Sequence, residues 1–154
     1  MSEIKAYRAK PNPAGKDSSG GNAKPQQLLG EWVDLANHGS VIIRLAGIHL
    51  AHVEFSHACV PKPNPITYWK GSASEALQPG EIIRVHTGCG SDAHLMSRDD
   101  WNGVHHHSYA ENRWFVLNNR CGDTISLWLK TGDTWSRLDH AQYDSNPPEG
   151  AVLT

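Results

Sequence analysis

The stretch from Trp114 to Tyr143 constrains the fold most, because it reads as three short strands joined by tight turns. Its middle strand, Thr124–Lys130, alternates with a period of two, which is typical of a strand that buries one face. The apolar side of this strand carries Ile125, Leu127 and Leu129. Asn, Gly and Asp residues, which tolerate the backbone angles of turns, lie on both sides of it. We therefore expect flanking strands at Trp114–Leu117 and Trp135–Tyr143.

Several shorter apolar runs precede this stretch, and turn residues separate them. We expect strands at 4–9, 28–37, 41–50, 66–69 and 82–87. The 14 Gly and 9 Pro residues interrupt the chain so often that an all-β sandwich or barrel is the predicted class. Residues 93–109 follow neither a helical nor a strand period, so we expect a long surface loop there.

Residues 11–25 are rich in Pro, Gly and Ser and contain no large apolar side chain. This composition fits a linker, which would detach the first strand from the rest of the chain. It fits equally a long loop, which would return the chain to the same sheet. The composition alone leaves both arrangements open.

Charge, hydropathy and cysteine content limit the partners and the location. The formal net charge is −2 and no block of Lys or Arg occurs, which argues against nucleic acid as a partner. No apolar run approaches the roughly 20 residues of a membrane span, and no signal peptide begins the sequence. Cys59, Cys89 and Cys121 are odd in number and lack CxxC spacing, which disfavours a disulfide framework. We expect no membrane association and a cytoplasmic location.

Four motifs, taken in order, resemble those of the lamin tail domain, a family found in nuclear lamins and in many bacterial proteins. Glu31–Asn37 (EWVDLAN) is similar to the opening strand of that family, and Leu45–Leu50 to its L-x-G-W-x-L segment. Leu77–Glu81 resembles its L-x-P-G-E turn, and Asn118–Tyr143 resembles its closing hairpin. Ile48 departs from the pattern, because the family often has Trp there.

The resemblance covers residues 28–144 and implies an immunoglobulin-like β-sandwich of two mainly antiparallel sheets. It implies a single domain over 1–154, in which residues 1–27 form a first strand and a Pro/Gly/Ser-rich loop, 28–144 the core sandwich and 145–154 a C-terminal tail. Residues 11–25 are then a loop within the domain. The expected inner faces of the two sheets carry Val33, Leu35, Ile43, Leu45, Ile83, Val85, Ile125, Leu127 and Leu129.

The function that the resemblance implies is non-enzymatic. We expect a protein-interaction or scaffolding module that binds a protein partner or a second copy of itself, as a subunit of a larger assembly. Nuclear members of the family contact DNA as well as protein, but the acidic balance of this chain argues against DNA. Fold-level analogy alone is weak evidence for function, because one fold serves many functions and a function depends on particular side chains.

Residues 93–107 fall outside the family motifs and carry the side chains best suited to metal chemistry. Imidazole beside carboxylate suits Zn²⁺, Ni²⁺ or Cu²⁺, and the candidate ligands are His94, Asp99, His105 and His107. No catalytic template such as HExxH is present, so no catalytic residue is assigned. A solvated loop or an interface is the interpretation we favour. A metal-binding protein that uses residues 94–107 is the alternative function.

Cys89 lies three residues after His86, which raises the possibility of a reactive thiol. A small buried hydrophobic residue is the commoner role of a free cysteine, and we favour it.

Tryptophan is the remaining candidate for partner binding. The polar face of a sandwich should not carry Trp, so Trp there indicates a surface that something covers. The cover is either the long loops of the chain or a partner, and we favour the loops. The candidate residues are Trp32, Trp69, Trp101, Trp128 and Trp135.

Overall fold

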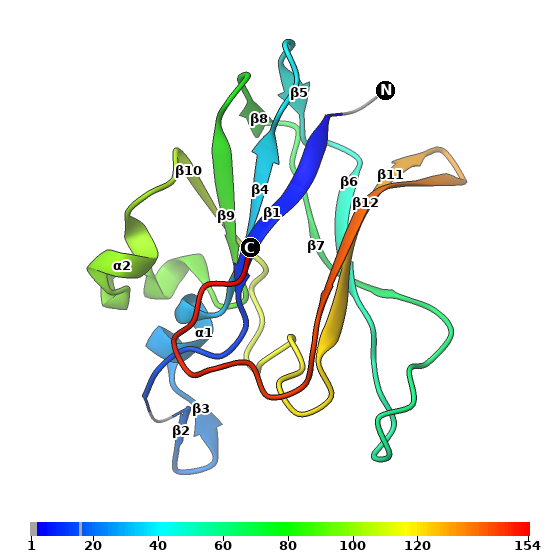
Figure 1. The fold of residues 1–154 in the computed structure, drawn as a ribbon. Helices are drawn as coiled ribbons and strands as arrows, with labels where there is room; N and C mark the ends of the chain where they lie inside the picture. The colour runs from blue at the N-terminus through cyan, green and yellow to red at the C-terminus, as the bar shows by residue number, and fades with distance from the viewer. Residues whose placement is uncertain (1–2, 16) are drawn as a thin grey trace.

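The computed structural model describes residues 3–15 and 17–154, and two four-stranded β-sheets form its framework (Figure 1). Residues 1, 2 and 16 of the predicted domain lie outside the described residues. The first sheet has the order β1 (Ile4–Lys10), β4 (Trp32–Asn37), β9 (Ile82–His86) and β10 (His106–Tyr109). Its neighbours are antiparallel except β10, which runs parallel to β9. Because β1 pairs with β4, the first strand belongs to the same sheet and is not detached from the rest of the chain by a linker.

The second sheet is antiparallel throughout. Its order is β12 (Thr134–Tyr143), β11 (Asp123–Thr131), β6 (Ile48–His52) and β7 (Ile66–Lys70). Two short ribbons complete the strands: β2 (Ser18–Ser19) with β3 (Asn22–Ala23), and β5 (Ile43–Arg44) with β8 (Ala76–Leu77). Among the described residues, no helix is long and apolar enough to cross a membrane.

One apolar core joins the two sheets, and strands of both contribute to it. Leu35 and Val85 come from the first sheet, while Leu50 and Leu127 come from the second, and all four are fully buried. Each of the nine predicted inner positions belongs to this core or packs against it. The predicted all-β class is therefore confirmed, with the sheets as the two layers.

The closing hairpin is confirmed at β11 and β12. Gly122 precedes it with a φ of +77°, and a Cβ there would lie 2.3 Å from the carbonyl oxygen of Tyr143, so only glycine fits. The strand predicted at Trp114–Leu117 is wrong, because this segment is irregular. The Oε1 atom of the buried Glu31 carboxyl group accepts hydrogen bonds from the backbone N–H groups of Val116 and Leu117, and so satisfies donors that a neighbouring strand would otherwise pair.

Three other expectations need correction. Residues 28–37 do not form one strand, because α1 (Pro25–Gly30) precedes β4 and begins with Pro at its first turn. Residues 41–50 divide into β5 and β6 at Gly47, whose φ is +85°. Residues 93–109 are not a plain loop, since they contain the second half of a 3₁₀ helix η1 (Gly90–Leu95), the helix α2 (Arg98–Trp101) and β10.

The structure also corrects the cysteine analysis. Cys59 and Cys121 form a disulfide, 62 residues apart in sequence, which joins the loop after β6 to the turn before β11. Cys89 is the free, buried cysteine. The odd number of cysteines was misleading, because one bridge and one buried thiol also give three.

Candidate functional site

The outer face of the first sheet is covered by the chain itself. Asp34, fully buried on β4, accepts two hydrogen bonds from the Arg84 guanidinium, at 2.8 and 2.9 Å, and pairs with Arg8. Arg84 also donates to the carbonyl oxygens of Asp100 and Asn102 in the covering segment. These contacts fix the segment that carries η1 and α2 over the sheet (Figure 1).

Trp32 lies beneath this cover and is 2% exposed. Its indole N–H donates to the Asp100 carboxylate at 2.9 Å, and the Arg84 guanidinium lies 3.6 Å from its ring centroid. Burial acts to raise the pKa of Asp100, but Lys10, Trp32 and Ser97 outweigh it and hold that pKa below its ordinary value. Trp32 is thus covered by its own chain and does not form a partner-binding surface.

Trp69 is also removed from the candidate surface. It belongs to the core between the sheets and is 3% exposed. Its indole N–H donates to the Ser108 hydroxyl of β10 at 2.9 Å. The indole therefore ties an edge strand of the second sheet, β7, to an edge strand of the first.

Trp101 is exposed on α2 and stacks on His107, with ring centroids 4.2 Å apart. His107 lies in a chain of contacts that runs from the carbonyl oxygen of Leu29 through His86 and His107 to the carbonyl oxygen of Trp101. The Nε2 atom of His86 and the Nδ1 atom of His107 are 2.8 Å apart. Burial lowers the pKa of His86 to about 4, so this ring is neutral at neutral pH.

The predicted metal ligands do not come together. His94 and Asp99 are exposed, on η1 and α2 respectively. The Nδ1 atom of His105 accepts the backbone N–H of Ile82, and both ring nitrogens of His107 contact other groups. Within residues 3–15 and 17–154, no group of three or more His, Cys, Asp or Glu side chains is placed to hold a metal ion. A metal site in this segment stays a prediction without support from the geometry.

Cys89 is a small buried residue rather than a partner of His86. Its thiol lies 3.8 Å from the carbonyl oxygen of Asn112, and burial raises its pKa. His86 directs its two nitrogens to Leu29 and His107 instead. The thiol is therefore neither exposed nor activated by that imidazole.

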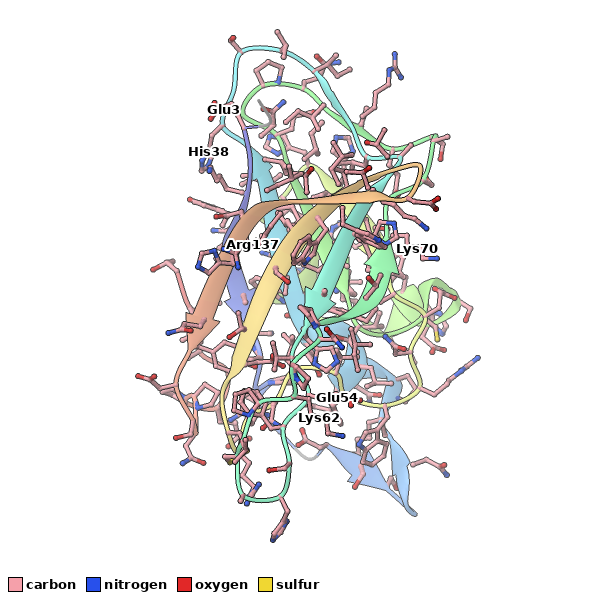
Figure 2. The ribbon with its side chains drawn as sticks, turned by 90° about the vertical axis from the view of Figure 1, so that its right-hand side faces the viewer. Glu3, His38, Glu54, Lys62, Lys70 and Arg137 are labelled. Carbon is pink, nitrogen blue, oxygen red and sulfur yellow. A yellow bond between two sulfur atoms is a disulfide. The ribbon has the colours of Figure 1, made fainter. Side chains whose placement is uncertain are left out.

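The outer face of the second sheet presents an aromatic and cationic surface. Residues that pair across antiparallel strands share one face of the sheet. The register of the four strands places Lys70, His49, Trp128 and Arg137 in one row that crosses the sheet. A neighbouring row contains Thr67, Ala51, Ser126 and His140, and Lys130 pairs with Trp135 beyond them. Figure 2 looks onto this face, with Lys70 and Arg137 at opposite sides.

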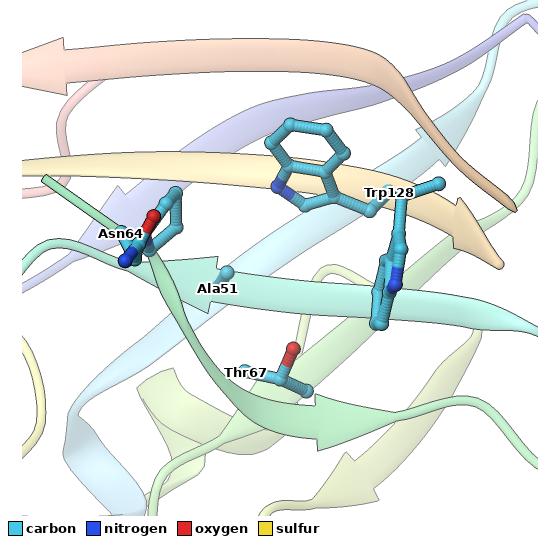
Figure 3. Close-up of a pocket in the computed structure, with 6 residues that line it drawn as sticks. Ala51, Asn64, Thr67 and Trp128 are labelled. Carbon is cyan, nitrogen blue, oxygen red and sulfur yellow. The ribbon is translucent and has the colours of Figure 1, made fainter. Parts of the chain in front are cut away.

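A pocket of about 330 Å³ opens on this face (Figure 3). It is lined by Ala51, Asn64, Pro65, Thr67, Trp128 and Trp135. In Figure 3, Ala51 on β6 lies between Asn64 and Trp128. The Trp128 indole N–H donates to the Ser126 hydroxyl at 2.9 Å, which fixes one wall.

His49 supports the second wall of the pocket. Its ring meets the Trp135 ring edge to face, with centroids 4.7 Å apart. Burial lowers the pKa of His49, and the nearby Lys70 and Lys130 lower it further. The Lys130 ammonium also lies 5.3 Å from the Trp135 ring centroid. His49 is therefore a neutral, buried support beneath an exposed indole.

Two of the five predicted Trp residues, Trp128 and Trp135, thus meet at one pocket. Sequence reasoning missed the four other lining residues and the three cations. The strand Thr124–Lys130 did contain a signal for one cation, because its period places Lys130 on the same face as Trp128. Asn64 and Pro65 gave no such signal, since they lie in a loop.

Comparison with protein-family models finds no matching family, and comparison with curated protein sequences finds no matching protein. The fold defines the class as an all-β protein with two four-stranded sheets around one core. The resemblance to the lamin tail domain rests on its sequence motifs.

Proposed function

We propose that this protein is a non-enzymatic protein-binding module with a lamin-tail-like, immunoglobulin-like sandwich. Its binding surface is the outer face of the second sheet. The observation that carries this proposal is the contrast between the two outer faces. Trp32 is buried under its own chain on one face, whereas Trp135 on the other is 45% exposed beside an open pocket.

The immunoglobulin-like arrangement is supported by where the motifs fall. The E-W-V-D-L-A-N motif provides β4, the L-Q-P-G-E motif leads into β9, and the closing motif forms β11 and β12. These strands belong to two layers that enclose one core, as in that class of sandwich. Only the edge strand β10 is parallel to its neighbour among the paired strands of the two sheets, which is compatible with the expectation of mainly antiparallel sheets.

A protein partner is the occupant that the surface chemistry favours. Trp and Arg are the residues that most often dominate binding energy at protein interfaces, and this face presents Trp128, Trp135 and Arg137 together. The pocket has the size to enclose one large side chain of a partner. A second copy of the chain is one such partner, and it would make the protein a subunit of its own assembly.

The charged residues of the other sheet have structural roles. Asp34, Arg84 and Asp100 are buried and use their charges to hold the covering segment in place. This use of the buried charges supports a scaffold rather than an enzyme. It is also consistent with a binding surface that lies on the opposite layer.

The disulfide between Cys59 and Cys121 indicates the kind of compartment in which the protein works. Disulfides persist in oxidising compartments and are rare in a reducing cytoplasm. We therefore propose that the protein works in an oxidising environment, in place of the cytoplasmic location expected from the sequence.

Selection from a library of random short peptides tests the proposed function. We expect peptides that bind the wild-type protein, lose affinity for Trp135→Ala and keep their affinity for Trp114→Ala. Trp114 is the matched control because it is 54% exposed and lies outside this face. Light scattering on the same variants detects a second copy as the partner. The proposal fails if no peptide is enriched, or if Trp135→Ala binds as well as wild type.

A further inference from the structure

We infer that the partner presents an acidic segment to this face. One apolar side chain of the segment enters the pocket at Trp128 and Trp135, and its carboxylates contact Lys70, Lys130 and Arg137. This inference rests on the proposed function and adds the chemistry of the partner.

The charge of the face is the first argument. At the outward positions set by the register, the second sheet carries three cations, Lys70, Lys130 and Arg137, and no carboxylate. Asp139 of β12 pairs with the inward residue Leu127, and its carboxylate accepts the backbone N–H of Ala6. The whole chain has a formal net charge of −2, so this cluster runs against the overall balance.

The lack of internal partners is the second argument. On the first sheet, Arg8, Lys10 and Arg84 each pair with a carboxylate of the chain. Among the described residues, no ion pair involves any of the three cations of the second sheet. Their charges therefore stay available to carboxylates from outside, and such complementarity favours acidic partners over basic ones.

The arrangement around the pocket is the third argument. Lys70 and Arg137 lie at the two ends of the row that contains Trp128, so an occupant of the pocket has a cation on either side. Lys130 approaches the Trp135 ring on the same face. The Trp128 ring is already fixed by Ser126, so little ordering of this wall accompanies binding. An apolar anchor flanked by carboxylates matches these positions.

A single-stranded nucleic acid would use similar groups, but the geometry favours the peptide. Nucleic-acid surfaces combine a basic groove with aromatic rings on which successive bases stack. Here both rings line one pocket, and the protein as a whole is acidic. A single-stranded nucleic acid would therefore find stacking rings at a single site only.

The sequences enriched in the peptide selection provide the test. We expect them to carry a net negative charge and at least one apolar residue, and to bind more weakly as salt rises. A triple variant with Lys70→Gln, Lys130→Gln and Arg137→Gln removes the positive charge of the face. Its affinity for a selected peptide should fall by about tenfold or more. The matched control removes three exposed cations elsewhere, in Arg44→Gln, Arg98→Gln and Arg113→Gln together, and should leave affinity within about twofold of wild type.

Three results would overturn the inference. The enriched peptides could lack an acidic bias, the triple Gln variant of the face could bind them as tightly as wild type, or the protein could bind oligothymidylate in place of acidic peptides. If peptides need Trp135 but are not acidic, the proposed function stands and this inference fails. If no peptide needs Trp135, both fail.

Discussion

Trp128 donates its indole N–H to the hydroxyl of Ser126, two residues earlier on the same strand, at 2.9 Å. Both residues face outward on β11, so the bond holds one wall of the pocket in place before any partner arrives. An ordered wall reduces the conformational entropy lost on binding. The pocket is therefore partly organised by the strand that forms its base.

Ser126→Ala tests this relationship. Loss of one hydrogen bond costs about 1 kcal/mol, so we expect the affinity for a selected peptide to fall about fivefold. The acidic preference of the face should not change, because the three cations remain. Ser136→Ala on the neighbouring strand β12 is the control, and titration by tryptophan fluorescence provides the measurement. Equal affinities for the two variants would show that the bond does not organise the pocket.

Asp34→Asn tests the cover of the first sheet. The substitution leaves Arg84 buried without a carboxylate, and breaking a buried ion pair in this way costs about 3–5 kcal/mol. We expect the free energy of unfolding, measured in urea, to fall by that amount. Asp133→Asn, in the exposed turn between β11 and β12, should change it by less than about 0.5 kcal/mol. Similar small effects in both variants would contradict the assigned role of Asp34.

His86 should make stability depend on pH. Its pKa in the folded protein is about 4, below its ordinary value of 6.5, so the unfolded chain binds the proton first as pH falls. Stability from this residue is therefore present above pH 6.5 and is lost toward pH 4, by about 3 kcal/mol in all. His86→Asn keeps an N–H for the carbonyl oxygen of Leu29 but does not titrate. Its urea midpoint should vary less with pH, and an unchanged slope would contradict the prediction.

Alkylation tests the disulfide between Cys59 and Cys121. Denatured but unreduced protein should take up one alkyl group, at Cys89, and reduced protein should take up three, which mass spectrometry distinguishes. Reduction should also lower stability by about 4 kcal/mol, because the bridge closes a loop of 62 residues. Three alkyl groups before reduction, in protein made under oxidising conditions, would show that the bridge does not form.

The parts of the fold that sequence predicted are those with a local period. Thr124–Lys130 alternates over seven residues, and its apolar side chains lie in the core as expected. The segments that it missed are held by distant groups. Val116 and Leu117 bond to Glu31, and β10 pairs with β9 across an intervening helical segment. Short segments of this kind carry no period of their own.

The candidate site was only partly predictable for the same reason. The period of β11 placed Trp128 and Lys130 together on the outward face. The other wall depends on how β12 pairs with β11, and on the loop that brings Asn64 and Pro65 beside β6. Likewise, the sequence contained no sign that Cys59 would meet Cys121, because this contact joins distant segments. Cover of Trp32 by the chain itself agrees with the interpretation favoured from the sequence, but the residues that cover it were not predicted.

Hydrogen exchange of the protein with and without a selected peptide tests the central claim most directly. If the outer face of the second sheet is the binding surface, the peptide should slow exchange in the backbone of β6, β7, β11 and the start of β12. Residues 90–109, which cover the other sheet and include its edge strand β10, should exchange at the same rate in both samples. Protection of residues 90–109 without protection of β11 would contradict the account.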